Sequence, residues 1–379
     1  LGAAAATVAA SRLGTFARGC FTYGSPRTGN KKFINTIKCP VWRFRNQRDL
    51  VTRVPFILLG FTHVGKFCYI DRNHEIRIGA VKFWRLFKDS IASVFNKTVA
   101  DGFVDHGIGD YSKYIEKIDS ALDKELELYS ESEFCEPLKY ALEGGKRIRP
   151  IITLLAAESV GQIDDNVYAG ACAIELLHTE SVIHDDIIDN ETQRRHKDPF
   201  HIKYGYNTSV LTGDFVLGLI LNISSRLDKA RVTKDLATAA MLMSEGEVLE
   251  GKLEESEDVT FEDYIKVMDY KTATAFEMAA KLGAVIGGGS EEEISGLAEY
   301  GKNIGIAYQI KDDLMDWKNE DKLFNLLVKK SSDPRVVFNK MEELLKSYSQ
   351  KALESLRKVK DSDSKHNLEE LVSFTEFKA

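Results

Sequence analysis

The chain has 379 residues, of which 29% are charged and 44% hydrophobic. It is therefore long enough for one large or two ordinary globular domains, and its composition excludes a largely disordered protein. The net charge of −7 is unevenly distributed: residues 1–110 hold 17 basic and 7 acidic side chains, which leaves 34 basic and 51 acidic ones for the remainder. Opposite charge indicates two parts with different roles. The basic side chains of the first part are dispersed, so we expect no nucleic-acid binding.

The cysteines and the apolar runs indicate the cellular compartment and whether the chain crosses a membrane. The five cysteines are scattered and form no Cys-x-x-Cys pair, which favours free thiols in a reducing compartment, and we expect a cytoplasmic protein. The apolar residues 1–14 follow no basic region and are not typical of a signal peptide. The longest apolar run, Val54 to Phe61, contains a proline and is too short to cross a bilayer, so we expect no transmembrane segment.

Short strands are predicted in the first part. After a helix-like run at Ala3 to Ser11, apolar or alternating residues predict strands at 20–23, 41–45, 67–70 and 75–78. This mixture is typical of an α/β fold.

Four stretches of the first part, FTYGSPRTGN, VWRFRNQRDLVTRVP, FTHVGKFCYI and DHGIGDY, resemble the C-terminal half of class 3 lipases, which have the α/β-hydrolase fold. The resemblance implies that Asp49 and His106 are the acid and the histidine of a catalytic triad, and that His63 is structural. The first residues resemble those that follow the serine of the Gly-x-Ser-x-Gly motif, so the nucleophile would precede Leu1. Without it His106 has nothing to activate, and we expect residues 1–110 to be an inactive hydrolase fragment, with partner binding as the alternative role.

From Tyr111 onward apolar residues recur at helical spacing, and the breaks carry Gly, Pro or Asp-Asn. A mainly α-helical domain is therefore expected at 111–379. Its helices are predicted at 111–129, 134–143, 149–160, 165–190, 207–226, 231–253, 261–284, 291–316, 334–360 and 366–376.

This second part holds two copies of one acidic pattern, Asp-Asp-x-x-Asp, at residues 185–189 and 312–316. Each lies within an expected helix, where the first and last carboxylates are four residues apart and share a face. Such clustered like charges repel one another and are costly to bury without a cation. Two of these faces opposed across a helical bundle would line a cavity suited to hard divalent cations that carry phosphate oxygens.

Basic and hydrogen-bonding residues accompany both acidic patterns. GGKRIRP, residues 144–150, places two glycines and three cations at an expected helix start, where phosphate groups bind readily. The others are Arg194-Arg195, Lys271-Thr272 and His178. Each one alone is compatible with an ordinary surface or structural side chain.

The blocks GGKRIRP, LLHTESVIHDDIID, RR, GDFVLG, YKTA and QIKDDLMD occur in this order and resemble the trans-isoprenyl diphosphate synthases (the polyprenyl synthetase family) over about 260 residues. The resemblance implies an all-α isoprenoid-synthase helical bundle, a homodimer, and a Mg²⁺-dependent prenyltransferase. Its substrates would be isopentenyl diphosphate and an allylic diphosphate.

The resemblance also implies residue roles. Asp185, Asp189 and Asp312 would bind the Mg²⁺ ions that hold the allylic diphosphate. Asp186, Asp313 and Asp316 would assist through bound waters and neighbouring groups. The allylic diphosphate would contact Arg194, Lys271, Thr272 and Gln309. Isopentenyl diphosphate would contact Lys146, Arg149, His178 and Arg195.

This layout suits ionisation of an allylic diphosphate, because metal ions, Arg and Lys neutralise the leaving group. The double bond of isopentenyl diphosphate attacks the resulting cation, and a proton is lost to the departing diphosphate. The alternatives are a non-catalytic synthase subunit, a terpene cyclase, and a lipid hydrolase in a fuller form of the first part. The two intact Asp motifs argue against the first two, and the missing serine argues against the third.

Three features stay open. Glu180 and Ser181, one turn before Asp185, include no large aromatic side chain, so we expect a product longer than C15, with C20 favoured. After Asp316 the family usually has a Gly- and Lys-rich lid, whereas this chain reads WKNEDKLFNLLVKKSSDPR; we expect a shortened lid in which Lys322, Lys329 or Lys330 replaces its cations. The junction near residue 110 is compatible with a native fusion, a gene-model error or an artificial fusion.

Overall fold

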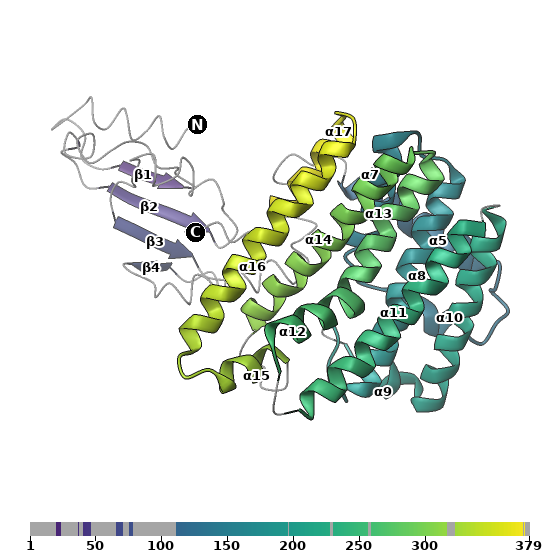
Figure 1. The fold of residues 1–379 in the computed structure, drawn as a ribbon, viewed down its shortest axis with the longest axis horizontal. Helices are drawn as coiled ribbons and strands as arrows, with labels where there is room; N and C mark the ends of the chain where they lie inside the picture. The colour runs from purple at the N-terminus through teal and green to yellow at the C-terminus, as the bar shows by residue number, and fades with distance from the viewer. Residues whose placement is uncertain are drawn as a thin grey trace. The chain divides into compact units, whose positions relative to one another are not determined.

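The computed structural model describes residues 20–23, 37, 41–46, 66–70, 76–78, 111–195, 197–227, 230–256, 259–316, 323–373 and 375. The chain divides into two compact units, residues 1–105 and 106–379, each taken by itself below (Figure 1).

The described part of the first unit is a four-stranded sheet in the order β1-β2-β3-β4. Its strands are β1 (Cys20–Tyr23), β2 (Val41–Asn46), β3 (Lys66–Ile70) and β4 (Ile76–Ile78). β1 and β3 each pair with β2 in parallel, and β4 pairs with β3 antiparallel, with Ile70 opposite Ile76. All four predicted strands are confirmed, and the parallel pairs agree with an α/β fragment. Asp49, His63, His106 and the predicted helix at 3–11 lie outside the described residues.

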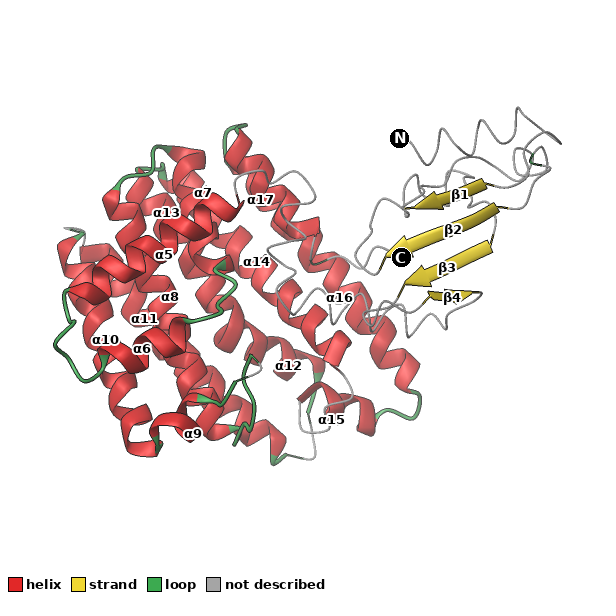
Figure 2. Cartoon of the chain, turned by 180° about the vertical axis from the view of Figure 1, so that it is seen from behind, coloured by secondary structure: helices red, strands yellow, loops and turns green. Residues whose placement is uncertain are grey.

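The second unit is a bundle of helices, and the only other regular feature among its described residues is a β-bridge between Arg194 and Lys197 (Figure 2). The predicted fold class is confirmed. The α-helices are α5 (Tyr111–Glu127), α6 (Cys135–Leu142), α7 (Ile148–Val160), α8 (Asp165–Ile188), α9 (Phe200–Tyr204), α10 (Tyr206–Arg226), α11 (Ala230–Glu254), α12 (Phe261–Val267), α13 (Thr274–Gly287), α14 (Glu291–Asp316), α15 (Leu323–Lys330), α16 (Pro334–Ser355) and α17 (Asp363–Ser373). A π-helix (Met268–Ala273) joins α12 to α13, and a 3₁₀ turn (Leu356–Lys358) follows α16.

Local sequence explains where several helices begin. The Asp164 carboxylate accepts a hydrogen bond from the Val167 backbone N–H and caps α8. Thr260 and Asp263 form a reciprocal capping box at the start of α12. Asp333 caps α16, whose first residue, Pro334, has no N–H to satisfy.

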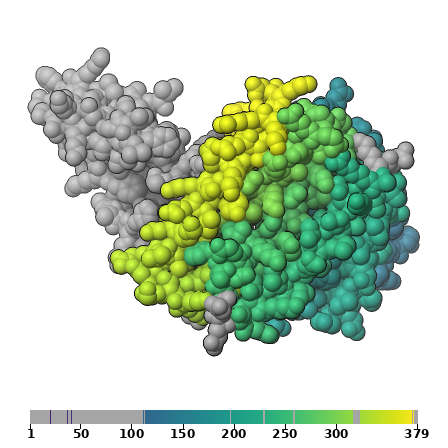
Figure 3. All heavy atoms as spheres, viewed as in Figure 1, coloured from purple at the N-terminus to yellow at the C-terminus, as the bar shows by residue number. Residues whose placement is uncertain are grey.

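Helix α8 lies at the centre of the bundle and packs against α7, α10 and α13 (Figures 1 and 2). Twelve of its 24 residues are buried. α13 approaches α7 closely, because a Cβ at Gly283 would lie 2.1 Å from the Thr153 carbonyl oxygen. α14 packs against α13 and α16, and Figure 3 shows the yellow α16 and α17 covering one face of the green helices. The central helix therefore carries the first Asp motif at its C-terminal end.

Some elements differ from the sequence-based prediction. The single helix expected at 261–284 is interrupted by the π-helix, and the short α9 and α15 were not predicted. α10 has the length and composition of a membrane span, although 44% of its most apolar window is buried within the bundle. A core helix passes the same test, and the buried face of α10 packs against α8.

Candidate active site

The first Asp motif stands at the C-terminal end of α8. Asp185 lies in the last turn and Asp189 is the C-cap residue, so both carboxylates lie at the negative end of the helix dipole. Burial raises the pKa of Asp185 to about 8, and the Glu247 carboxylate and Asp189 add to the shift while Lys271 opposes it. A carboxylate that is this hard to ionise favours a nearby cation.

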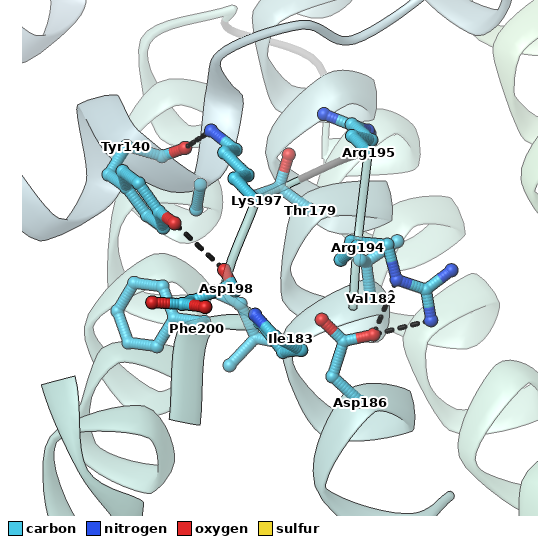
Figure 4. Close-up of a pocket in the computed structure, with 12 residues that line it drawn as sticks. Tyr140, Thr179, Val182, Ile183, Asp186, Arg194, Arg195, Lys197, Asp198 and Phe200 are labelled. Atoms are coloured by element: carbon cyan, nitrogen blue, oxygen red, sulfur yellow. Dashed lines mark hydrogen bonds and ion pairs between the residues drawn. The ribbon is translucent and has the colours of Figure 1, made fainter. Parts of the chain in front are cut away.

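Asp186 points away from this face and holds an arginine. Its side chain is 2% exposed, and the Arg194 Nε donates to Asp186 Oδ1 at 2.6 Å (Figure 4). A small cavity beside the pair is lined by residues of α6, α8 and the 194–200 segment. In this structure Asp186 therefore orients Arg194 and does not join Asp185 and Asp189.

The second Asp motif stands at the end of α14 and is held by a chain of hydrogen bonds. The Thr272 hydroxyl donates to Gln309 Oε1 at 3.1 Å, and the Gln309 amide donates to Asp313 Oδ1 at 2.9 Å. The buried Tyr264 hydroxyl donates to Asp313 Oδ2 at 2.6 Å. Asp313 is thereby fixed and is 4% exposed.

Asp312 and Asp316 complete that motif. Burial raises the pKa of Tyr308, and the negative charge of Asp312, four residues later on α14, raises it further. The side chain of Asp316 lies outside the described residues.

Lys271, in the π-helix, forms ion pairs with two carboxylates outside the Asp motifs. Its ammonium is 2.7 Å from Glu247 Oε2 and 2.6 Å from Glu250 Oε2, both on α11. Burial would lower the pKa of Lys271, but the carboxylates of Glu250, Asp185 and Glu247 outweigh burial and raise it, so the ammonium stays charged.

A cationic cluster of Arg149, Arg195 and the neighbouring His178 lies near the start of α7. The Nε atom of Arg149 is buried without a hydrogen-bond partner, and its guanidinium carbon lies 4.4 Å from the centre of the Phe276 ring. Burial lowers the pKa of His178 well below its usual range, and Arg149 and Arg195 lower it further, so this imidazole is neutral. An arginine with a buried, unused donor is chemically suited to an anion.

Side-chain hydrogen bonds and an ion pair hold the GGKRIRP loop in place. Gly144 has a φ of +75°, which glycine adopts without strain. The buried Arg147 side chain turns inward, with Nε 2.8 Å from Asp119 Oδ1 and Nη1 2.5 Å from Glu175 Oε1. The Tyr111 hydroxyl donates to the Lys146 carbonyl at 3.1 Å. Of the three cations in the motif, Arg147 is structural in this arrangement.

The structure shows the surroundings of Glu180 and Ser181, and of two lysines that were suggested as lid substitutes. Glu180 turns to a neighbour on its own helix, with Oε1 3.2 Å from His184 Nδ1, and the Ser181 hydroxyl donates to the His178 carbonyl at 2.9 Å. Of the three lysines suggested as lid substitutes, Lys322 lies outside the described residues. Lys329 and Lys330 line a cavity with Glu254 and Glu255, at the end of α11.

The donor set fits Mg²⁺ that arrives with a diphosphate. Within the described residues no three His, Cys, Asp or Glu side chains converge into a group that could hold a metal by themselves. Mg²⁺ keeps several waters and is usually held by one or two carboxylates together with substrate phosphate oxygens. Asp185 and Asp189 on one helix and Asp312 on another match that pattern.

Glu247, Glu250 and Tyr264 were not predicted from the sequence. Glu247 and Glu250 sit in EGEVLEGKLEE, which is typical of a solvated helix face. Their i,i+3 spacing was the one available signal that both share a side of α11.

The isoprenoid-synthase class of fold is defined by such an all-α bundle, with one Asp motif at the end of α8, a second at the end of α14, and a cationic cluster at the start of α7. The crystal structure of geranylgeranyl pyrophosphate synthetase from Pyrococcus horikoshii superposes with a TM-score of 0.61 at 30% identity, covering 70% of this chain and 97% of that one. The polyprenyl synthetase family model matches residues 131–366, and the chain belongs to this family. The class 3 lipase family model matches residues 1–59, a range that includes Asp49 and ends before His106.

Two curated relatives are similar over about half of the chain. Geranylgeranyl diphosphate synthase of Methanosarcina mazei is 36% identical over 205 residues, which are 52% of this chain and 63% of the relative. Octaprenyl diphosphate synthase of Escherichia coli is 38% identical over 174 residues, which are 46% of this chain and 54% of the relative. The chain thus spans between about half and two thirds of the length of these relatives.

Proposed function

We propose that residues 111–379 form a Mg²⁺-dependent prenyltransferase that condenses isopentenyl diphosphate with an allylic diphosphate. The observation that carries the proposal is the charge layout. One group is the cationic cluster around Arg149, which has a buried and unused donor. The other is the group of carboxylates around Asp185, with Lys271 among them. Two diphosphates, one of them metal-bound, suit these two environments.

The side chains would divide the work as follows. The diphosphate of isopentenyl diphosphate is bound by three cations and one neutral imidazole, namely Lys146, Arg149, Arg195 and His178. This binding fixes the position of the double bond. Lys271 and Arg194 bind the allylic diphosphate, while Thr272 and Gln309 orient it. When bound, Mg²⁺ neutralises the leaving diphosphate. The allylic C–O bond breaks, the double bond forms the new C–C bond, and the departing diphosphate accepts the proton. Holding both reactants in place removes much of the entropic barrier.

The assay supplies Mg²⁺, isopentenyl diphosphate and a C5, C10, C15 or C20 allylic diphosphate, and measures product length. Asp185→Ala and Asp312→Ala should each lower the rate by several orders of magnitude, because each removes charge stabilisation worth several kcal/mol (about 1.4 kcal/mol per tenfold). The exposed Glu342 on α16 gives a matched control, Glu342→Ala. Absence of elongation with every primer would refute the proposal.

We propose a C20 product. Support comes from Ser181 and Glu180, whose side chains are engaged within α8 and present no aromatic barrier one turn before Asp185. Ser181→Phe should shorten the product to C15. If it leaves the product length unchanged, α8 does not set the length at that turn.

We propose a homodimer that forms through α10. Large apolar side chains are exposed along this helix, namely Tyr206, Val210, Leu211, Leu217 and Leu221. The neighbouring α11, which packs against α10 (Figures 1 and 2), adds Met241 and Val248. Leu217→Asp should convert the dimer to a monomer in sedimentation equilibrium. A wild-type monomer at all concentrations would contradict the proposal, and co-sedimentation with lipid vesicles would assign α10 to a membrane surface instead.

For residues 1–110 we propose an inactive class 3 lipase-like fragment. The family match to residues 1–59 supports its origin. Hydrolysis of a short-chain ester by the purified chain would refute its inactivity.

The free buried thiols of Cys135 and Cys172 support a reducing, cytoplasmic location, which fractionation of the source cells tests.

A further inference from the structure

Lys271 is held by two carboxylates that belong to neither Asp motif. The ammonium lies within 2.7 Å of both Glu247 and Glu250, and the three side chains are only 15–21% exposed. The ammonium donates a charge-assisted hydrogen bond to each glutamate, and the two bonds fix the end of the flexible lysine side chain. The two glutamates are three residues apart, so they occupy one face of α11 and converge on the same atom.

The backbone around Lys271 allows α11 to approach the ammonium closely. Lys271 lies in the π-helix, a widened turn that is frequent at functional sites. Facing it on α11 is Gly246, where a Cβ would lie 2.6 Å from the Lys271 backbone nitrogen. The missing side chain thus lets α11 approach the π-helix closely enough for the next residue, Glu247, and Glu250 to reach the ammonium.

The charges nearby favour a positioning role over a purely structural one. Asp185 also acts on the Lys271 ammonium, so one cation is shared among three acidic side chains from two helices. A structural ion pair needs one partner, whereas three leave an excess of negative charge beside the cation. That excess is tolerable when further positive charge, such as a metal with its diphosphate, enters the site.

We infer that Glu247 and Glu250 are positioning residues that hold the Lys271 ammonium where it meets the allylic diphosphate. The inference rests on the proposed function. The two glutamates act through Lys271 and touch neither the reacting carbons nor the isopentenyl diphosphate pocket. Their loss should therefore affect one substrate only.

The test uses the full chain and the isosteric variants Glu250→Gln and Glu247→Gln, with Glu245→Gln, exposed on the same helix, as the matched control. Each of the first two should raise the KM for the allylic diphosphate about tenfold and leave the KM for isopentenyl diphosphate unchanged, because one of two hydrogen bonds to a charged group is weakened. The control should behave as wild type. Thermal melting confirms that each variant is folded.

A double-mutant cycle with Lys271→Met separates the roles. If the glutamates act through the lysine, Glu250→Gln should have no further effect on the allylic KM in the Lys271→Met background. If the effect persists there and the Mg²⁺ concentration for half-maximal rate rises, the glutamates act on the metal and the inference is wrong. Unchanged KM values in the single variants would also overturn it.

Calorimetry supplies a readout without turnover, with inorganic pyrophosphate and Mg²⁺ as the probe. Glu250→Gln should bind pyrophosphate more weakly than wild type by a similar factor, and binding equal to wild type contradicts the inference. A wild-type chain that elongates no primer refutes the proposed function, whereas an active wild type with unaffected variants refutes only the role of Glu247 and Glu250.

Discussion

The buried pair of Arg147 and Glu175 gives the most direct test of how the diphosphate loop is held. The Arg147 and Glu175 side chains are 7% and 3% exposed, and Nη1 lies 2.5 Å from Oε1. Arg147→Met leaves the Glu175 carboxylate buried beside an apolar chain. Removing one partner of such a pair costs about 3–5 kcal/mol. For a unit of this size that corresponds to a fall in melting temperature of roughly 6–20 °C.

Urea unfolding followed by circular dichroism measures the loss of stability. The double variant Arg147→Met/Glu175→Gln should recover part of the loss, because neither charge is then stranded. Arg335→Ala, which breaks the exposed pair with Asp333, is the matched control and should leave the midpoint unchanged. Because Arg147 supports the loop that carries Lys146, the KM for isopentenyl diphosphate should also rise in Arg147→Met. A loss below about 1 kcal/mol with an unchanged KM would refute the reasoning.

Three further outcomes are expected. Because burial raises the pKa of Asp185 to about 8, binding of Mg²⁺ with pyrophosphate at pH 7 should release more protons from the wild type than from Asp185→Asn, and should strengthen as the pH rises through about 8. Calorimetry in buffers of different ionisation enthalpy measures proton release, and equal release by the two proteins would contradict the prediction. Arg149→Lys keeps the charge but loses the planar fork, and should raise the KM for isopentenyl diphosphate about tenfold in steady-state assays while the allylic KM stays unchanged. Tyr264→Phe removes the hydrogen bond to Asp313 Oδ2 and should lower kcat while it changes both KM values little. A wild-type kcat would show that this hydrogen bond is dispensable.

Local sequence determined much of this protein. Apolar spacing and helix caps predict the long helices within a few residues, since such helices depend on nearby residues and on one buried face. The four strands of the first unit follow equally from local alternation. The two Asp motifs stand out because six carboxylates in apolar helices require a cation, whatever the fold.

Only the tertiary structure assigned partners to those charges. GGKRIRP presents three cations at similar positions, yet Arg147 turns to Glu175 on α8 while Arg149 keeps an unused donor. Asp185 and Asp186 are adjacent in sequence, but they point to different sides of α8. Asp186 therefore pairs with Arg194, whereas Asp185 lies in the candidate site. Glu247 and Glu250 reach Lys271 because Gly246 lets two helices approach. Except for Asp186 and Arg194, which are 8 positions apart, these contacts join residues more than 20 positions apart. Helix packing decides such contacts, so no local pattern of residues encodes them.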